Sequence, residues 1–196
     1  MTTGRRNMLQ RFGGIFRFVI LILALSAVPR VDAGQVPDGG LPVGSTAPDF
    51  RTNAVNGDEF GLKDIASKRK LVLLSFWGLR CGECIDEIPS LNEARKTWGE
   101  KGLEVVGVNA DGIDADILRK QIRTLPNRPE YVLIVDPDLK IADAYKLKAA
   151  PLTVGISPEM EVVFVHSGFK EGDAKILADV LSKALSTTGQ AKGPGK

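Results

Sequence analysis

Short apolar runs alternate along the chain with stretches in which apolar residues recur every three or four positions. Residues 71–77 (LVLLSFW) are continuously apolar apart from one serine, which is typical of a strand covered on both faces. Residues 157–160 contain a proline between two further apolar runs and indicate a hairpin turn. In all, the pattern predicts strands over 71–77, 103–108, 131–135, 152–156 and 162–166.

Helical spacing occupies the segments between these strands. The apolar or small residues Ile88, Leu91, Ala94 and Trp98 predict one face of a helix that starts near Cys84. Further helices are predicted from Asp114 to a point before Pro126, over 140–145, and from Asp173 with Ile176, Leu177, Val180, Leu181 and Leu185 on its inner face. This order of elements predicts an α/β fold with a mixed central sheet flanked by helices.

The first 33 residues have the pattern of an export signal. Five arginines accompany an apolar run over 18–28, and Val31-Asp32-Ala33 offers small residues for cleavage after Ala33. Eleven apolar residues are fewer than the roughly 20 of a membrane span, although an uncleaved N-terminal anchor stays open. Residues 1–33 are therefore expected to be a signal peptide or an anchor, and the mature protein to be extracytoplasmic, either soluble or anchored by its N-terminus.

The content of glycine and proline indicates where the linker, the domain and the C-terminal tail begin and end. Residues 34–46 are expected to be a flexible linker, 47–185 one domain, and 186–196 a disordered tail. The whole chain has 26 basic and 24 acidic residues, but removing five arginines and one aspartate with residues 1–33 leaves 21 and 23. This slightly acidic domain gives no argument for nucleic-acid binding, and a monomer is expected.

The two cysteines form a C-x-x-C pair, Cys81 and Cys84, between a predicted buried strand and the first turn of a helix. Unpaired N–H groups and the positive end of the helix dipole favour a thiolate there, so Cys81 is the expected nucleophile. Cys84 is then within reach to resolve a mixed disulfide. The pair is expected to cycle between a redox-active disulfide and a dithiol.

Two other interpretations of the pair are weaker. A structural zinc ion needs two more ligands, whereas the chain offers only His166 besides these cysteines. A purely structural disulfide would close a very short loop and stabilise little. We therefore expect redox activity with no metal and no cofactor apart from the disulfide itself.

Several motifs together resemble the TlpA/ResA-type thioredoxin-like proteins, which are exported thiol–disulfide oxidoreductases. The similar segments are VGSTAPDF at 43–50, Phe76-Trp77, C-x-x-C-x-x-E-x-P at 81–89 and Ala150-Pro151. The resemblance implies a thioredoxin-like fold with an N-terminal extension and a central βα insertion. It also implies that a cis Pro151 lies opposite the cysteines, and that Trp77, Ala150 and Pro151 contribute to substrate binding.

The chain departs from the family pattern around the cysteines. Arg80 occupies a position where the family commonly has Trp, and Gly82-Glu83 lacks the proline frequent inside the motif. Arg80 favours a thiolate at Cys81, whereas Glu83 opposes it. The sequence does not decide which of the two effects on the ionisation of Cys81 is larger. Ala150 replaces a bulkier residue and leaves more room in the substrate groove.

Glu87 lies three residues after Cys84, on the same helix face. A partly buried carboxylate there can accept and donate a proton for Cys84, a role that the resemblance also implies. The alternative is a solvated surface glutamate. Pro89, two residues later, is expected to kink the helix.

The sequence thus predicts an exported thiol–disulfide oxidoreductase that exchanges with protein thiols and disulfides. The resemblance suggests work as a reductant, for example in cytochrome c maturation, with a membrane thiol reductase as electron donor. A Sco-like copper chaperone using Cys81, Cys84 and His166 is the alternative, although such proteins usually have C-x-x-x-C. A peroxiredoxin-like activity shares A-P-D-F but needs a threonine where this chain has Gly78.

Overall fold

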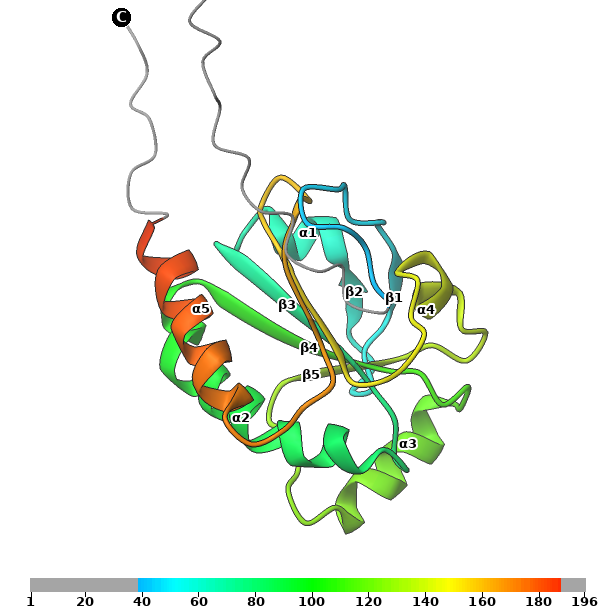
Figure 1. Ribbon diagram of the computed structural model, residues 1–196. Coiled ribbons are helices and arrows are strands. Elements are labelled where there is room, and N and C mark those ends of the chain that lie inside the picture. The colour runs from blue at the N-terminus through cyan, green and yellow to red at the C-terminus, as the bar shows by residue number, and fades with distance from the viewer. Residues whose placement is uncertain (1–38, 188–196) are drawn as a thin grey trace, which may run out of the picture. The chain divides into compact units, whose positions relative to one another are not determined.

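The computed structural model describes residues 39–187, so the expected export segment and the residues after 187 lie outside the described part (Figure 1). At its centre is a five-stranded sheet in the order β5-β4-β3-β6-β7. The strands are β3 (Leu71–Trp77), β4 (Leu103–Asn109), β5 (Val132–Val135), β6 (Leu152–Ile156) and β7 (Val162–Ser167). β3, β4 and β5 are parallel, while β6 is antiparallel to both β3 and β7. The predicted mixed sheet is confirmed.

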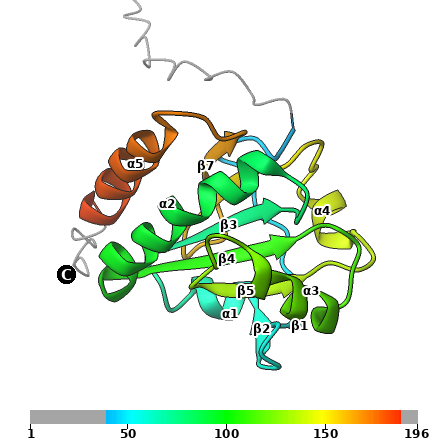
Figure 2. The ribbon, with the colours of Figure 1, turned by 90° about the horizontal axis from the view of Figure 1, so that it is seen from below.

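Helices cover both faces of this sheet (Figure 2). On one face lie α2 (Gly82–Trp98), α3 (Ala115–Gln121) and α5 (Asp173–Thr187), and on the other lie α1 (Leu62–Ala66) and α4 (Lys140–Ala144). Two short 3-10 turns follow α2 and α3, at Gly99–Lys101 and Ile122–Thr124. The segment α3–β5–α4 between β4 and β6 is the central insertion that the resemblance implied.

Strand β3 shows why the chain forms two cores. Its seven residues are all buried, and their side chains point alternately to the two faces of the sheet. Val72, Leu74 and Phe76 enter the core beneath α1 and α4. Leu73 and Trp77 enter the core beneath α2, α3 and α5. Ser75 shares this second face, which places one hydroxyl group beneath α2.

An N-terminal hairpin precedes the sheet and has no counterpart in the elements predicted above. It consists of β1 (Arg51–Asn53) and β2 (Glu59–Gly61), paired antiparallel, and leads directly into α1. Strands of three residues are too short to show a recognisable alternation. The turn is closed by Asn56 and Asp58 around Gly57, whose φ of 98° lies in the region that favours glycine.

One helical prediction needs correction. Ile176 is 49% exposed, so it does not belong to the inner face of α5. The buried apolar residues of that helix are Leu177, Leu181 and Leu185, which recur every four positions and form a narrower stripe than expected. In α2, helical structure extends through Pro89 to Trp98, and the expected kink at Pro89 stays a prediction.

The described part of the expected linker, residues 39–46, packs against the domain. The N–H of Gly40 donates to the carbonyl of Lys146 at 3.0 Å, and that of Gly44 donates to Val162 at 2.8 Å. Gly39 lies so close to Lys148 that a Cβ atom added to it would be 3.2 Å from the Cβ of that lysine. Ordered structure therefore begins before the expected boundary at Ala47. At the other end, α5 runs to Thr187, past the expected boundary at residue 185.

Within residues 39–187, no helix has both the length and the apolar content that crossing a bilayer requires.

Candidate active site

The two cysteines form a disulfide where β3 passes into α2. The S–S distance is 2.05 Å, and the Cα atoms are 5.2 Å apart. Cys81 is the N-cap residue of α2, and its Sγ accepts the backbone N–H of Cys84 at 3.2 Å. When the disulfide is reduced, this N–H and the positive end of the helix stabilise a thiolate at Cys81.

The two sulfur-bearing residues differ in exposure. Cys84 is 1% exposed and belongs to the core beneath α2, whereas Cys81 is half-buried at the surface. A thiol or disulfide of another protein can therefore reach Cys81 but not Cys84. This is the difference in exposure that an attacking Cys81 and a resolving Cys84 require.

A groove lies beside Cys81, opposite the first residues of β6. The Ala150–Pro151 peptide bond is cis, and the carbonyl oxygen of Ala150 is 3.5 Å from the Sγ of Cys81. The groove has a volume of about 360 Å³, and its lining includes Arg80, Lys148 and Asp111.

Trp77 lines the groove but is almost fully buried. Only 2% of the residue is exposed, so its expected contact with a substrate stays a prediction. It packs over β4, where a Cβ atom added to Gly107 would lie 3.1 Å from the indole nitrogen. The alternation of β3 directs Trp77 into the core beneath α2, so it supports the cysteines from below.

Asp111 fixes the loop that leads into the cysteine motif. Its Oδ2 accepts the N–H of Leu79 at 2.8 Å and the side-chain amide of Asn109 at 2.8 Å. A Cβ atom added to Gly78 would lie 2.7 Å from Oδ1 of Asp111, so there is no room for a side chain at 78. The threonine of a peroxiredoxin would not fit there. Sequence reasoning missed Asp111, although a polar residue after β4 lies at the same sheet edge as the end of the parallel β3.

Glu87 is buried beneath the disulfide. It is 2% exposed, and its carboxylate accepts hydrogen bonds from Thr153 Oγ1 at 2.7 Å and from Ser75 Oγ at 3.0 Å. Burial raises the pKa of Glu87, and the two hydroxyl hydrogen bonds oppose that rise only in part. Glu87 is therefore not the solvated residue of the alternative interpretation.

Ser75 and Thr153 are site residues that the sequence analysis did not identify. Each is a hydroxyl residue inside an otherwise apolar strand, at directly opposed positions of β3 and β6. A buried polar side chain needs a partner, and the isolated hydroxyls were the available signal.

Glu83, inside the C-x-x-C motif, contacts the loop that leads into α5. Its Oε2 accepts the backbone N–H of Phe169 at 3.1 Å. The carboxylate thus holds the loop after β7 against the first turn of α2. Arg80, on the other side of Cys81, is exposed at the rim of the groove.

His166 is held by a carboxylate and not by the cysteines. Its Nε2 lies 3.1 Å from Oδ2 of Asp173. Within residues 39–187, no three His, Cys, Asp or Glu side chains are grouped so that they could hold a metal ion. The placement of His166 therefore gives no support to the copper-chaperone alternative.

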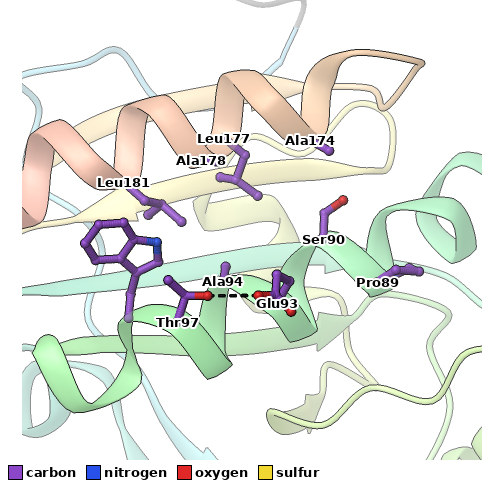
Figure 3. Close-up of a pocket in the computed structure, with 10 residues that line it drawn as sticks. Pro89, Ser90, Glu93, Ala94, Thr97, Ala174, Leu177, Ala178 and Leu181 are labelled. Carbon is purple, nitrogen blue, oxygen red and sulfur yellow. Dashed lines mark hydrogen bonds between the residues drawn. The ribbon is translucent and has the colours of Figure 1, made fainter.

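A second groove, of about 440 Å³, lies between α2 and α5 (Figure 3). Its walls include Ala94 and Trp98 from α2 and Leu177 and Leu181 from α5. Across one turn of α2, the hydroxyl of Thr97 donates to Glu93 at 3.0 Å. None of the predicted site residues lines this groove.

Comparison with known proteins agrees with this geometry. Residues 43–165 match the AhpC/TSA family. The thiol–disulfide oxidoreductase ResA of Bacillus subtilis is 32% identical over 155 residues, which cover 79% of this chain and 82% of ResA. The ResA of Halalkalibacterium halodurans is 30% identical over 64% of this chain and 68% of its own length.

Solved structures show the same likeness. A Chlorobium tepidum protein named as a thiol:disulfide interchange protein DsbE superposes with a TM-score of 0.66 at 29% identity. The match covers 74% of this chain and 99% of the Chlorobium protein. The chain therefore belongs to the AhpC/TSA family and, within it, to the ResA-type thioredoxin-like thiol–disulfide oxidoreductases.

Proposed function

We propose that this oxidoreductase works outside the cytosol as a reductant of protein disulfides. The observation that carries the proposal is the unequal exposure of the two cysteines above a buried carboxylate. Cys81 can be reached from the groove, whereas Cys84 and Glu87 are enclosed together beneath it. This arrangement suits two successive exchange steps, one with a client and one within the protein.

In the first step, the thiolate of Cys81 attacks one sulfur atom of a client disulfide. A mixed disulfide forms between Cys81 and the client, and the second client sulfur leaves with the electron pair of the broken bond. The N–H of Cys84 stabilises the attacking thiolate. The nearby Ala150 carbonyl and the adjoining groove offer contacts for an extended client segment.

In the second step, Cys84 releases the client. Glu87 accepts the proton of the Cys84 thiol, and the resulting thiolate attacks the Sγ of Cys81. The Cys81–Cys84 bond forms while the bond to the client breaks, so the client leaves with both of its sulfurs reduced. A carboxyl group with a raised pKa is suited to this task because it accepts a proton more readily than an ordinary carboxylate does.

The setting of this reaction rests on the N-terminal pattern and on the relatives. An export segment places the domain where thiols are not kept reduced by cytosolic systems, so a reductant there needs a supply of electrons. We propose that a membrane thiol reductase supplies them. Cysteine thiols that must be reduced before haem is attached to apocytochrome c are suitable clients.

Trapping tests the first step. In cells that produce Cys84→Ser, a client disulfide attacked by Cys81 should stay attached as a mixed disulfide, to be identified after non-reducing electrophoresis. Cys81→Ser is the matched control and should trap nothing from the groove, because Cys84 is enclosed. The absence of adducts with Cys84→Ser, together with failure of the purified dithiol protein to reduce a small disulfide, contradicts the proposed function.

Two further measurements test the direction of electron flow and the location of the protein in the cell. The reduction potential of the Cys81–Cys84 pair, measured against glutathione, should be low enough for the dithiol to reduce its trapped clients. In intact cells, a thiol reagent that cannot cross the inner membrane should label Cys81 after reduction. Labelling only after the cells are broken would contradict an extracytoplasmic location.

A further inference from the structure

A small cavity lies beneath the disulfide on the side of β7 and α5. Its polar lining consists of Glu87, Thr153, His166 and Asp173, and Phe164 and Phe169 are among its apolar walls. The volume is about 10 Å³, close to the smallest space that holds one water molecule. The cavity thus joins side chains from α2, β6, β7 and α5.

The strand register explains how a histidine comes to lie there. Thr153 of β6 and His166 of β7 are directly opposed in the antiparallel pair, so their side chains project from the same face of the sheet. Thr153 already donates to Glu87. The imidazole therefore lies one strand farther from α2 than the hydroxyl that contacts the carboxylate.

Asp173 holds the imidazole from the opposite side. The Nε2 of His166 lies 3.1 Å from Oδ2 of Asp173, and this oxygen also accepts the N–H of Lys170 at 3.0 Å. Burial raises the pKa of Asp173, but the hydrogen bonds from His166 and Lys170 outweigh it, and the pKa lies below its usual range. An ionised Asp173 keeps a proton on Nε2, which leaves Nδ1 as the nitrogen that can accept another.

Glu87 and His166, which both line the cavity, differ in their exposure to solvent. Glu87 is 2% exposed, whereas 27% of the side chain of His166 is exposed. In the proposed function, Glu87 gains a proton whenever Cys84 resolves a mixed disulfide, and this proton has to reach solvent if it is to replace one of those that the departing client thiolates take up. A carboxyl group with almost no solvent contact needs a route for this transfer.

We propose that His166, oriented by Asp173, relays protons between Glu87 and solvent across the cavity. After the Cys81–Cys84 bond has formed, protonated Glu87 gives its proton to neutral His166, and the imidazolium releases it to water. No bond to sulfur changes in this step, so the electron balance is that of the exchange reaction itself. The inference rests on the proposed function and adds a positioning residue and a proton route to it.

The other ionisable groups near the cavity are consistent with His166 as the proton relay. Burial, followed by the charge of Glu87, raises the pKa of Tyr131 before β5, so its phenol stays neutral. Asp173 raises the pKa of Glu87 and His166 lowers it, after the larger effects of burial and the hydroxyl groups. Lys170 faces Asp173 from the loop after β7. His166 is thus the ionisable group of the cavity lining that is partly exposed and carries a ring nitrogen that can accept a proton.

His166→Gln tests the relay in the full chain, because glutamine keeps a polar side chain but cannot carry the proton. The steady-state rate of reduction of a small disulfide, with a dithiol as electron donor and followed from pH 6 to pH 9 in weak buffer, should fall by about tenfold, less than the roughly hundredfold that loss of an acid–base group can cost. Added imidazole should restore the rate. Val163→Gln, at an exposed position of the same strand, is the matched control and should leave the rate unchanged.

Coupling to Glu87 separates a relay from a general structural effect. In a Glu87→Gln background, His166→Gln should cause no further loss of rate, because the relay has no proton to carry. An unchanged rate and pH profile in His166→Gln, or a loss that imidazole does not restore in a folded variant, overturns the relay and leaves disulfide exchange intact. Absence of exchange in the unmodified protein overturns the proposed function itself.

A second measurement does not depend on the folding of a variant. In the unmodified protein, oxidised by an aromatic disulfide whose thiolates stay ionised, proton release to a pH-indicator dye should follow disulfide formation without a lag, and imidazole should not accelerate it. A lag that imidazole shortens would show that the protein has no efficient route of its own, which also overturns the relay.

Discussion

Thr153 and Glu87, which are 66 residues apart in the chain, are joined by a 2.7 Å hydrogen bond beneath the disulfide. Thr153 lies two residues after the cis Ala150–Pro151 bond, and Glu87 lies three residues after Cys84. This bond therefore links the segment that follows the cis bond to the carboxylate that we propose as the acid–base group of Cys84. A substitution at either residue should affect both the position of this segment and the environment of the carboxylate.

Replacing Glu87 with glutamine should stabilise the oxidised protein at neutral pH. Burial raises the pKa of Glu87 in the folded state above its value in the unfolded chain, so the folded state binds a proton more tightly. The free energy of unfolding of the unmodified protein therefore falls as the pH rises from the unfolded pKa, near 4.5, through the raised folded pKa. The Glu87→Gln variant has no carboxyl group at this position, so its free energy of unfolding should not show this decrease.

Chemical denaturation at several pH values measures the effect. The gain from Glu87→Gln should be small near pH 4 and should grow toward neutral pH. Glu100→Gln, at an exposed position after α2, serves as the control and should show a difference that changes little with pH. A gain that shrinks as the pH rises would contradict the raised pKa of Glu87.

Removing the hydroxyl of Thr153 should raise the pKa of Glu87 further. Thr153→Val keeps the shape of the side chain but removes a donor that favours the charged carboxylate. A hydrogen bond to a charged group contributes about 1.5 kcal/mol or more, which corresponds to roughly one pKa unit. Carbon NMR of the labelled carboxyl group, with the disulfide oxidised, reports the titration.

Ser75→Ala is the matched comparison for this prediction. Its bond to the same carboxylate is longer, at 3.0 Å, and its effect on the pKa is smaller. We expect an upward shift in both variants, with the larger shift in Thr153→Val. A downward shift in either variant would show that the hydroxyl stabilises the protonated form instead.

A methyl group at residue 78 should disturb the loop that leads to Cys81. In Gly78→Ala, the new Cβ atom would lie 2.7 Å from Oδ1 of Asp111, whose other oxygen holds the N–H of Leu79. We expect a loss of about 1–3 kcal/mol in the free energy of unfolding and a lower rate of exchange.

Gly99→Ala is the control for this substitution, because no atom lies within 4 Å of the Cβ position at Gly99. Its backbone is helical, with φ −56° and ψ −49°, so alanine should be neutral or slightly stabilising there. Equal stabilities of the two variants would mean that Asp111 moves aside at no cost.

Neutralising Arg80 should raise the pKa of the Cys81 thiol in the reduced protein. Arg80 is exposed, so its effect is screened by solvent, and Arg80→Gln should raise the pKa by only a few tenths of a unit. The ultraviolet absorbance of the thiolate measures the titration. Arg80→Lys keeps the charge and should stay close to the unmodified protein.

Salt provides a second check on Arg80. The difference between Arg80→Gln and the unmodified protein should shrink as the ionic strength rises. A difference that persists in high salt would point to a lost side-chain contact and not to the charge.

Strong periodicity made most of the fold predictable. The five strands of the central sheet are long, apolar and bounded by turn residues, and each was predicted to within one residue at either end. The N-terminal hairpin was not predicted, because β1 and β2 have three residues each and their pairing depends on the rest of the domain. Ile176 was wrongly assigned to the inner face because the apolar residues of this helix form a broad stripe. The sequence does not show which side of that stripe faces the core.

The candidate site was predictable where one chain segment carries the chemistry. Cys81, Cys84 and Glu87 follow one another at three-residue intervals, which is a recognisable spacing. Ser75, Asp111, Thr153 and Asp173 come from four other elements or loops, and only the folded sheet brings them to the site. The burial of Trp77 likewise depends on the position of Gly107 in the neighbouring strand.

The contact between Gly39 and Lys148 has a consequence for the membrane reductase that we propose as electron donor. Lys148 lines the groove beside Cys81, so the described part of the chain begins at the edge of that groove. Between the expected end of the export segment and Gly39 lie five residues, which span at most about 18 Å. In a chain that keeps its export segment as an anchor, the groove is held near the bilayer, and encounter with a membrane reductase depends on the effective concentration set by this short tether.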